Sequence, residues 1–156
     1  MQVVDSVTSQ LIEGNKSTQS THSFLHVSCS TISPASARRF ADIHIHSGND
    51  LVTAPVFARP DGIAKRQATW MLGGPEANRQ TAASLLSGLG NIVDMGNDVG
   101  AANVVKLCGN FLIATSIESI GEAMALAEKN GVDRERVMSI LSSSIFDCLI
   151  FKVLLS

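Results

Sequence analysis

The sequence is poor in aromatic side chains and in net charge. It has no tyrosine and one tryptophan, and aromatic residues make up 4% of its 156 residues. The formal net charge is −2, so the chain lacks the strongly basic character that proteins use to bind nucleic acids or anionic membranes. The scarcity of aromatic rings also leaves little surface for stacking on unpaired bases. We therefore expect no nucleic-acid partner.

The sequence also lacks the spacings that indicate a metal site. Its three cysteines, Cys29, Cys108 and Cys148, are far apart and form no Cys-x-x-Cys pair, so we expect buried free thiols in a reducing compartment. His44 and His46 are two residues apart in a segment that we predict to be helical, so their side chains should point in different directions. We expect no metal site.

No targeting or membrane-spanning segment is evident. The N-terminus lacks a basic region followed by an apolar core, which a secretory signal requires. The apolar stretch 145–155 is interrupted by Asp147 and Lys152 and is too short to cross a bilayer. We expect a cytoplasmic protein, with a mitochondrial location left open, and no membrane partner.

Hydrophobic patterning divides the chain into three parts. Residues 1–22 are polar and rich in Ser, Thr and Gln, which is typical of a poorly ordered or weakly helical leader. Between residues 23 and 96 expected strands alternate with expected helices, which predicts βα units and a parallel sheet. The expected strands are 24–28, 51–56, 68–72 and 92–95, and the expected helices are 34–47 and 75–87.

Only helices are expected from residue 97 onward, where the chain resembles the opening of an all-helical domain. A long helix should cover about 99–130 and end at Gly131. Asp133 should cap another helix that runs to about residue 142. A further helical piece is expected over 147–154.

Lys106 is the only charged residue between Asp98 and Glu118. A lysine in such apolar surroundings must either extend to water or be retained for chemistry. Burial would lower its pKa, so that it could donate and accept a proton near neutral pH. Asn110 lies four residues later, on the same face of the expected helix, and the two side chains could hold a small hydroxyl or carbonyl substrate. A solvated lysine is the commoner outcome for such a pattern, and it remains the alternative.

Several short segments, in this order and spacing, resemble the β-hydroxyacid dehydrogenase family over roughly residues 24–150. That family includes 3-hydroxyisobutyrate dehydrogenase, 6-phosphogluconate dehydrogenase and imine-reductase-like proteins. The segments are Ser30-Thr31-Ile32-Ser33-Pro34, Ala54-Pro55-Val56, Gly73-Gly74, Gly96 with Gly100, and Lys106-Leu107-Cys108-Gly109-Asn110.

The resemblance implies an α/β fold: the second half of a Rossmann-type parallel sheet over residues 23–96, then the start of an all-helical domain over 97–156. It implies an NAD(P)-dependent oxidoreductase, with NADP or NAD as cofactor, acting on a small hydroxy acid, carbonyl or imine. Lys106 would exchange a proton with the substrate and Asn110 would hold it, while Ser30 and Thr31 would lie on the nicotinamide side. We also expect a homodimer through the helical region.

The expected substrate loop departs from the family pattern. Where the family usually has Ser-Gly-Gly after Ala-Pro-Val, this chain has Phe57, Ala58 and Arg59. Phe57 removes a hydroxyl donor, Ala58 makes close backbone approach harder, and Arg59 could bind a carboxylate with two hydrogen bonds. These residues favour a bulkier or less acidic carbonyl or imine over 3-hydroxyisobutyrate.

The glycine-rich phosphate loop of the family, Gly-x-Gly-x-x-Gly, is absent. Gly88-Leu89-Gly90 has no third glycine and precedes an expected strand instead of a helix. We therefore expect the isolated chain to bind dinucleotide weakly and turn over little, because binding energy from the adenosine end would be lost. The alternatives are a non-catalytic, enzyme-derived interaction protein, suggested also by the apolar stretch 145–151, and a truncated fragment without a function of its own.

Overall fold

The computed structural model describes residues 2–17, 23–148 and 150–151. The chain divides into two compact units, Met1–Leu107 and Cys108–Ser156. The predicted boundary after residue 96 lies earlier, because the first turns of helix α5 (Ala101–Lys129) belong to the first unit. Ala102 and Asn103, on these turns, are fully buried.

The first unit contains two pairs of parallel strands. Strand β1 (Leu25–Ser28) pairs in parallel with β2 (Asp50–Thr53), and β4 (Ala68–Leu72) pairs in parallel with β5 (Gly90–Asp94). An isolated antiparallel bridge between Thr53 and Gly73 joins β2 to the end of β4. The parallel pairs agree with the predicted βα units, and the mixed α/β architecture of the first unit is as expected.

One strand runs against the expected direction. Residues 51–56 were expected to form a single strand, but Pro55 has no N–H for a ladder hydrogen bond, and the chain resumes as a short strand, β3 (Val56–Phe57). This strand pairs antiparallel with β4, with Phe57 opposite Thr69. The expected parallel pairing is therefore joined at this edge by one short antiparallel strand.

The polar leader contains a helix, α1 (Gln2–Ser17). Thr8 and Ile12, one turn apart, are 2% and 7% exposed, and Asp5 accepts a hydrogen bond of 2.5 Å from Arg39. Of the two alternatives for the leader, the helical one therefore holds over this range. Residues 18–22 lie outside the described part of the chain.

Local signals set the ends of α2 (Pro34–His46). Ser33 caps the helix, because its Oγ accepts a hydrogen bond of 3.0 Å from the backbone N–H of Ser36. Pro34 occupies the first helical turn, where its missing N–H costs nothing. The helix ends before Gly48, which has a φ of +72°. Both ends agree with the prediction.

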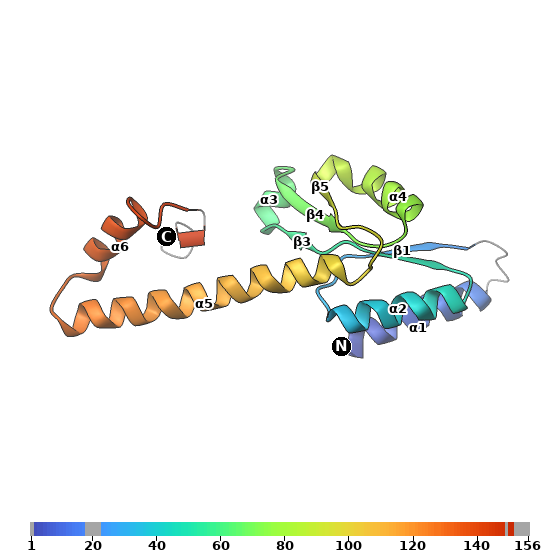
Figure 1. Ribbon diagram of the computed structural model, residues 1–156, viewed down its shortest axis with the longest axis horizontal. Helices are drawn as coiled ribbons and strands as arrows, with labels where there is room; N and C mark the ends of the chain where they lie inside the picture. Colours follow the sequence, from blue (N-terminus) through green and yellow to red (C-terminus); the bar gives the residue numbers. More distant parts are fainter. Residues whose placement is uncertain (1, 18–22, 149, 152–156) are drawn as a thin grey trace. The chain divides into compact units, whose positions relative to one another are not determined.

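The core of the first unit lies where α4 (Glu76–Leu86) contacts β2, β4 and β5 (Figure 1). Its centre consists of Val52, Ala54, Leu72 and Ala82, all 1% exposed or less. A short helix, α3 (Pro60–Ala64), follows β3, and a 3₁₀ turn, η1 (Ser87–Leu89), leads into β5.

Gly90 explains why β5 begins earlier than predicted. A Cβ atom at this position would lie 2.1 Å from the carbonyl oxygen of Ala68, which is its partner in the parallel ladder with β4. Only glycine permits so close an approach of two backbones, and the strand therefore starts at Gly90 instead of residue 92.

The second unit contains most of α5 and the helix α6 (Arg134–Ser142). Gly131, with a φ of +69°, ends α5, and Asp133 caps α6 by accepting a hydrogen bond of 2.8 Å from the N–H of Arg136. Both ends agree with the prediction. The helical piece expected over 147–154 falls largely outside the described residues.

In the described part of the chain, α5 alone is long and apolar enough to cross a membrane by length and composition. Its most apolar window of 18 residues has a mean hydropathy of 1.3, and none of that window is buried. Length and composition are weak evidence by themselves, because helices of soluble proteins can meet the same criteria.

Candidate functional site

The start of α5 packs against the carboxyl ends of β2 and β4 in the first unit. The Oγ1 of Thr53, at the end of β2, donates a hydrogen bond of 2.6 Å to the carbonyl oxygen of Val99, and Thr53 is fully buried. A Cβ at Gly73, just after β4, would lie 2.8 Å from the carbonyl oxygen of Asp98 and 3.5 Å from the Cβ of Ala102. These contacts fix where α5 begins.

Asn103 links α5 to the segment that follows β1. Its Oδ1 accepts a hydrogen bond of 3.1 Å from the backbone N–H of Ile32. The side chain is fully buried, and its Nδ2 has no hydrogen-bond partner among the described residues. Ser30 and Thr31, the residues expected on the nicotinamide side, lie in the same segment and are exposed.

Sequence reasoning did not identify Asn103 as a site residue. The available signal was an isolated amide in the small apolar run 101–105, three residues before Lys106. Three residues is close to one helical turn, so Asn103 and Lys106 lie near the same face of α5. Through its bond to Ile32, Asn103 holds the part of α5 that carries Lys106 against the segment after β1.

Lys106 is half-buried and lies against an aromatic ring. Its Nζ is 4.3 Å from the centre of the Phe57 ring, on β3. Burial lowers the pKa of Lys106, because the charged ammonium loses hydration. The ring face attracts the ammonium and opposes part of this effect. The structure thus brings together Lys106, expected to transfer the proton, and Phe57, expected in the substrate loop.

The other expected site residues are exposed. Asn110 follows Lys106 by four residues on α5 and falls in the second unit. Ala58 is exposed, and the Nε of the exposed Arg59 lies 3.6 Å from a carboxylate oxygen of Asp61, in the first turn of α3. Of the three residues expected in the substrate loop, the structure places only Phe57 against Lys106.

Two arginines hold the turn that leads into α5. Arg79, on α4, has its Nε 2.8 Å from Asp94 and donates a hydrogen bond of 2.7 Å to Asn97. Arg38, on α2, binds both carboxylate oxygens of Asp98, at 3.0 and 2.7 Å. Because Arg38 and the N–H of Gly100 both donate to Asp98, they hold the pKa of this carboxyl below its usual range.

The histidines and cysteines that the structure describes form no cluster that could hold a metal ion. His44 is buried and His46 exposed on α2, so they face different directions as predicted. The Nδ1 of His44 donates a hydrogen bond of 2.7 Å to the carbonyl oxygen of Phe40, and its Nε2 lies 3.1 Å from the Nδ1 of His26. No group of three or more potential ligands that could hold a metal ion occurs among the described residues.

The three cysteines are free, and all are exposed. The expectation that they would be buried is therefore wrong. It rested on the general tendency of free cysteines to lie in protein interiors, which carries no information about these particular positions.

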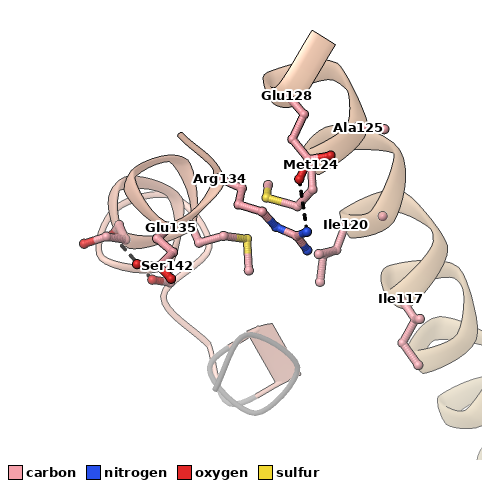
Figure 2. Close-up of a pocket in the computed structure, with 11 residues that line it drawn as sticks. Ile117, Ile120, Met124, Ala125, Glu128, Arg134, Glu135 and Ser142 are labelled. Atoms are coloured by element: carbon pink, nitrogen blue, oxygen red, sulfur yellow. Dashed lines mark hydrogen bonds and ion pairs between the residues drawn. The ribbon is translucent and has the colours of Figure 1, made fainter. Parts of the chain in front are cut away.

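The second unit contains a cavity of about 750 Å³ between α5 and α6. Figure 2 shows Ile117, Ile120 and Met124 along α5, with Arg134 reaching from α6 toward Glu128. Arg134 donates a hydrogen bond of 3.1 Å to Glu128. None of the site residues expected from the sequence lines this cavity.

The residues present fit one end of a nicotinamide dinucleotide. Ser30 and Thr31 lie just beyond the carboxyl end of the parallel strand β1, where such sheets bind dinucleotides, and a buried amide donor of Asn103 lies in the same region. Within the described ranges no Gly-x-Gly loop precedes a helix to hold the pyrophosphate, because the one Gly-x-Gly of the sequence, at 88–90, starts in the 3₁₀ turn before β5.

Two family models match the chain. The NAD-binding domain of 6-phosphogluconate dehydrogenase matches residues 2–109. A domain described as the NAD-binding part of NADP-dependent 3-hydroxyisobutyrate dehydrogenase matches residues 100–154. Both descriptions concern proteins that use NAD or NADP, and together the matches cover nearly the whole chain.

Individual relatives agree with these matches. The NAD-dependent L-serine dehydrogenase of Pseudomonas aeruginosa is 36% identical over 121 residues, which cover 77% of this chain and 40% of the relative. The 3-hydroxyisobutyrate dehydrogenase of the same organism is 32% identical over 120 residues, with coverages of 77% and 40%. The chain spans about two fifths of the length of the curated relatives that it matches.

A solved structure shows the same fold. The structure of Mycobacterium tuberculosis 3-hydroxyisobutyrate dehydrogenase with L-serine superposes with a TM-score of 0.69 and 28% identity, over 81% of this chain and 43% of the other. This similarity agrees with the Rossmann-type fold predicted from the sequence. The chain therefore belongs to the β-hydroxyacid dehydrogenase family, whose members include 3-hydroxyisobutyrate dehydrogenase and 6-phosphogluconate dehydrogenase.

Proposed function

We propose that this chain is part of an NAD(P)-dependent oxidoreductase in which Lys106 donates or accepts the proton of the reaction. The substrate would be a small hydroxy acid, carbonyl or imine. The observation that carries the proposal is the position of Lys106, which is half-buried beside Phe57 on a helix whose start packs at the carboxyl ends of β2 and β4. Ligands of open α/β sheets bind at such strand ends.

The environment of Lys106 suits proton transfer. Burial lowers the pKa of Lys106, which brings its neutral and charged forms closer in population near neutral pH. Asn110, one helical turn later, would hold the substrate oxygen through its amide. Ser30 and Thr31 would hold the nicotinamide end with their hydroxyl groups. When bound, the nicotinamide supplies or accepts the hydride.

The isolated chain should have little activity. It lacks a glycine-rich loop for the pyrophosphate, and energy from binding distant parts of a substrate or cofactor contributes to rate as well as to affinity. We therefore expect weak binding of NADPH and NADH, and slow turnover at most.

A non-catalytic role in protein interaction is the second candidate. Large apolar side chains are exposed along α5, including Phe111 at 66%, Leu112 at 59% and Leu126 at 66%. Exposed apolar surface of this extent favours association, and the expected homodimer through the helical region would cover it. The two candidates are compatible if the enzyme is itself a dimer.

The proposed role of Lys106 can be tested on the chain itself. After reductive ¹³C-methylation of the lysines, NMR titration would follow each dimethylamino group through pH. We expect Lys106 to titrate below 10.5, the ordinary pKa of a lysine side chain, because burial penalises its charged form. A titration midpoint for Lys106 at or above 10.5 would contradict the proposed environment.

Turnover supplies the second part of the test. Nicotinamide absorbance would report oxidation of 3-hydroxyisobutyrate and L-serine, and reduction of a carbonyl or imine panel. Any turnover found should fall by a factor on the order of 10²–10⁴ in Lys106→Met and remain unchanged in the control Lys65→Met. Equal rates in Lys106→Met and the unaltered chain would exclude Lys106 as the proton-transfer group.

A further inference from the structure

The ring of Phe57 is part of the surroundings of the proposed proton-transfer atom. The Nζ of Lys106 lies 4.3 Å from the ring centre. A substrate oxygen that exchanges a proton with this nitrogen must come within about 2.6–3.2 Å of it. The substituents on the carbon that carries this oxygen would then border the ring.

The ring is held in place by the sheet. Phe57 is in β3 and pairs with Thr69 of β4, and the preceding Val56 pairs with Trp70. Trp70 is 6% exposed, so the neighbouring pair belongs to the packed part of the first unit. A side chain on a paired strand is positioned more precisely than one on a free loop.

An aromatic face is a poor partner for a carboxylate. The face of the ring carries negative partial charge, which attracts cations and disfavours anions. The residues next along the chain do not offset this. Ala58 has no polar side-chain atom, and Arg59, whose side chain is 68% exposed, faces the carboxylate of Asp61 at 3.6 Å.

From this arrangement we propose that Phe57 determines specificity, selecting an uncharged carbonyl or imine with an apolar or aromatic substituent over a hydroxy acid. The inference rests on the proposed function, because it takes Lys106 as the group that meets the substrate. It adds a substrate class and names the residue that selects it.

The test uses protection of Lys106 from acetylation by acetic anhydride, quantified by peptide mass spectrometry, in the presence of NADP⁺. Acetophenone represents the uncharged aromatic ketone, and 3-hydroxyisobutyrate the hydroxy acid. We expect acetophenone to protect Lys106 at a concentration at least tenfold below that needed by 3-hydroxyisobutyrate. Lys65 and Lys129 serve as references within the same sample.

Two variants of Phe57 make the test specific. Phe57→Ser should raise the half-protecting concentration of acetophenone roughly tenfold, the scale expected for losing apolar contact in a pocket. Phe57→Leu keeps an apolar side chain, which preserves packing if the serine variant is unstable, and should also weaken protection because the ring face is lost. The matched control is Leu85→Ser, since the side chain of Leu85 is exposed on α4 and its loss should change nothing.

The outcomes separate the two proposals. Four results would overturn the inference. The two probes could protect Lys106 equally, the hydroxy acid could protect it better, neither could protect it, or both Phe57 variants could leave protection unchanged. The pH profile of acetylation tests the proposed function independently. A midpoint for Lys106 at or above 10.5 would contradict the proposed function. A lower midpoint without an effect of the Phe57 variants would contradict the inference alone.

Discussion

Replacing Thr53 by valine should loosen the start of α5. Thr53 is fully buried at the end of β2, and its hydroxyl donates a hydrogen bond of 2.6 Å to the carbonyl of Val99. Valine has nearly the same shape but no hydroxyl. The substitution therefore removes the hydrogen bond that ties the turn before α5 to the sheet, while filling the same volume.

The cost follows from leaving a buried acceptor without a partner. Val99 is 8% exposed, so water has little access, and an unsatisfied buried carbonyl costs about 1–3 kcal/mol. The added methyl group returns up to about 0.8 kcal/mol of apolar burial. With the full return from the methyl group, the difference of these two terms is a net loss of about 0.2–2.2 kcal/mol in the free energy of unfolding.

Urea denaturation would measure the loss, and hydrogen exchange of the amides of residues 101–107 would locate it. Thr69→Val is the matched control, because Thr69 is a half-buried strand threonine whose hydroxyl has no hydrogen bond among the described residues. Thr69→Val should keep the stability and the exchange rates of the unaltered chain. If Thr53→Val did the same, the hydrogen bond to Val99 would not anchor α5.

Two other contacts give further predictions. Arg79→Lys should lower the free energy of unfolding by about 1–3 kcal/mol. Arg79 is 9% exposed and uses its forked guanidinium group to bind both Asp94 and Asn97, which an ammonium group cannot reproduce. A urea midpoint equal to that of the unaltered chain would refute this prediction. Burial, with a smaller effect from His44, lowers the pKa of His26 from 6.5. Since the unfolded chain then binds more protons, stability should fall as pH drops below 6.5 and level off below the folded pKa. His26→Gln should lack this acid-side loss in urea titrations, and an identical pH dependence in the variant would contradict the assignment.

The element boundaries that could be predicted depend on local chemistry. Ser33 with Pro34 marks the start of α2, and Gly48 marks its end. In the same way, Gly131 marks the end of α5 and Asp133 marks the start of α6. Each of these residues acts on a backbone group only a few positions away, so its effect is visible in a short stretch of sequence.

The contacts that define the candidate site join distant parts of the chain. Asn103 binds the N–H of Ile32, and Phe57 lies against Lys106. No local pattern specifies either contact, because each depends on how β1, β3 and α5 come together. The antiparallel direction of β3 was missed for the same reason, and helix α1 was uncertain because its stability depends on burying Thr8 and Ile12.

The spacing of Lys106 and Asn110 limits how the sequence between them can vary. An α-helix turns by about 100° per residue, so a spacing of four residues brings two side chains to one helix face. Substitutions at 107–109 would preserve that shared face. Inserting or deleting one residue there would rotate Asn110 by about a quarter turn or more away from Lys106. The segment should therefore tolerate changes of identity and resist changes of length.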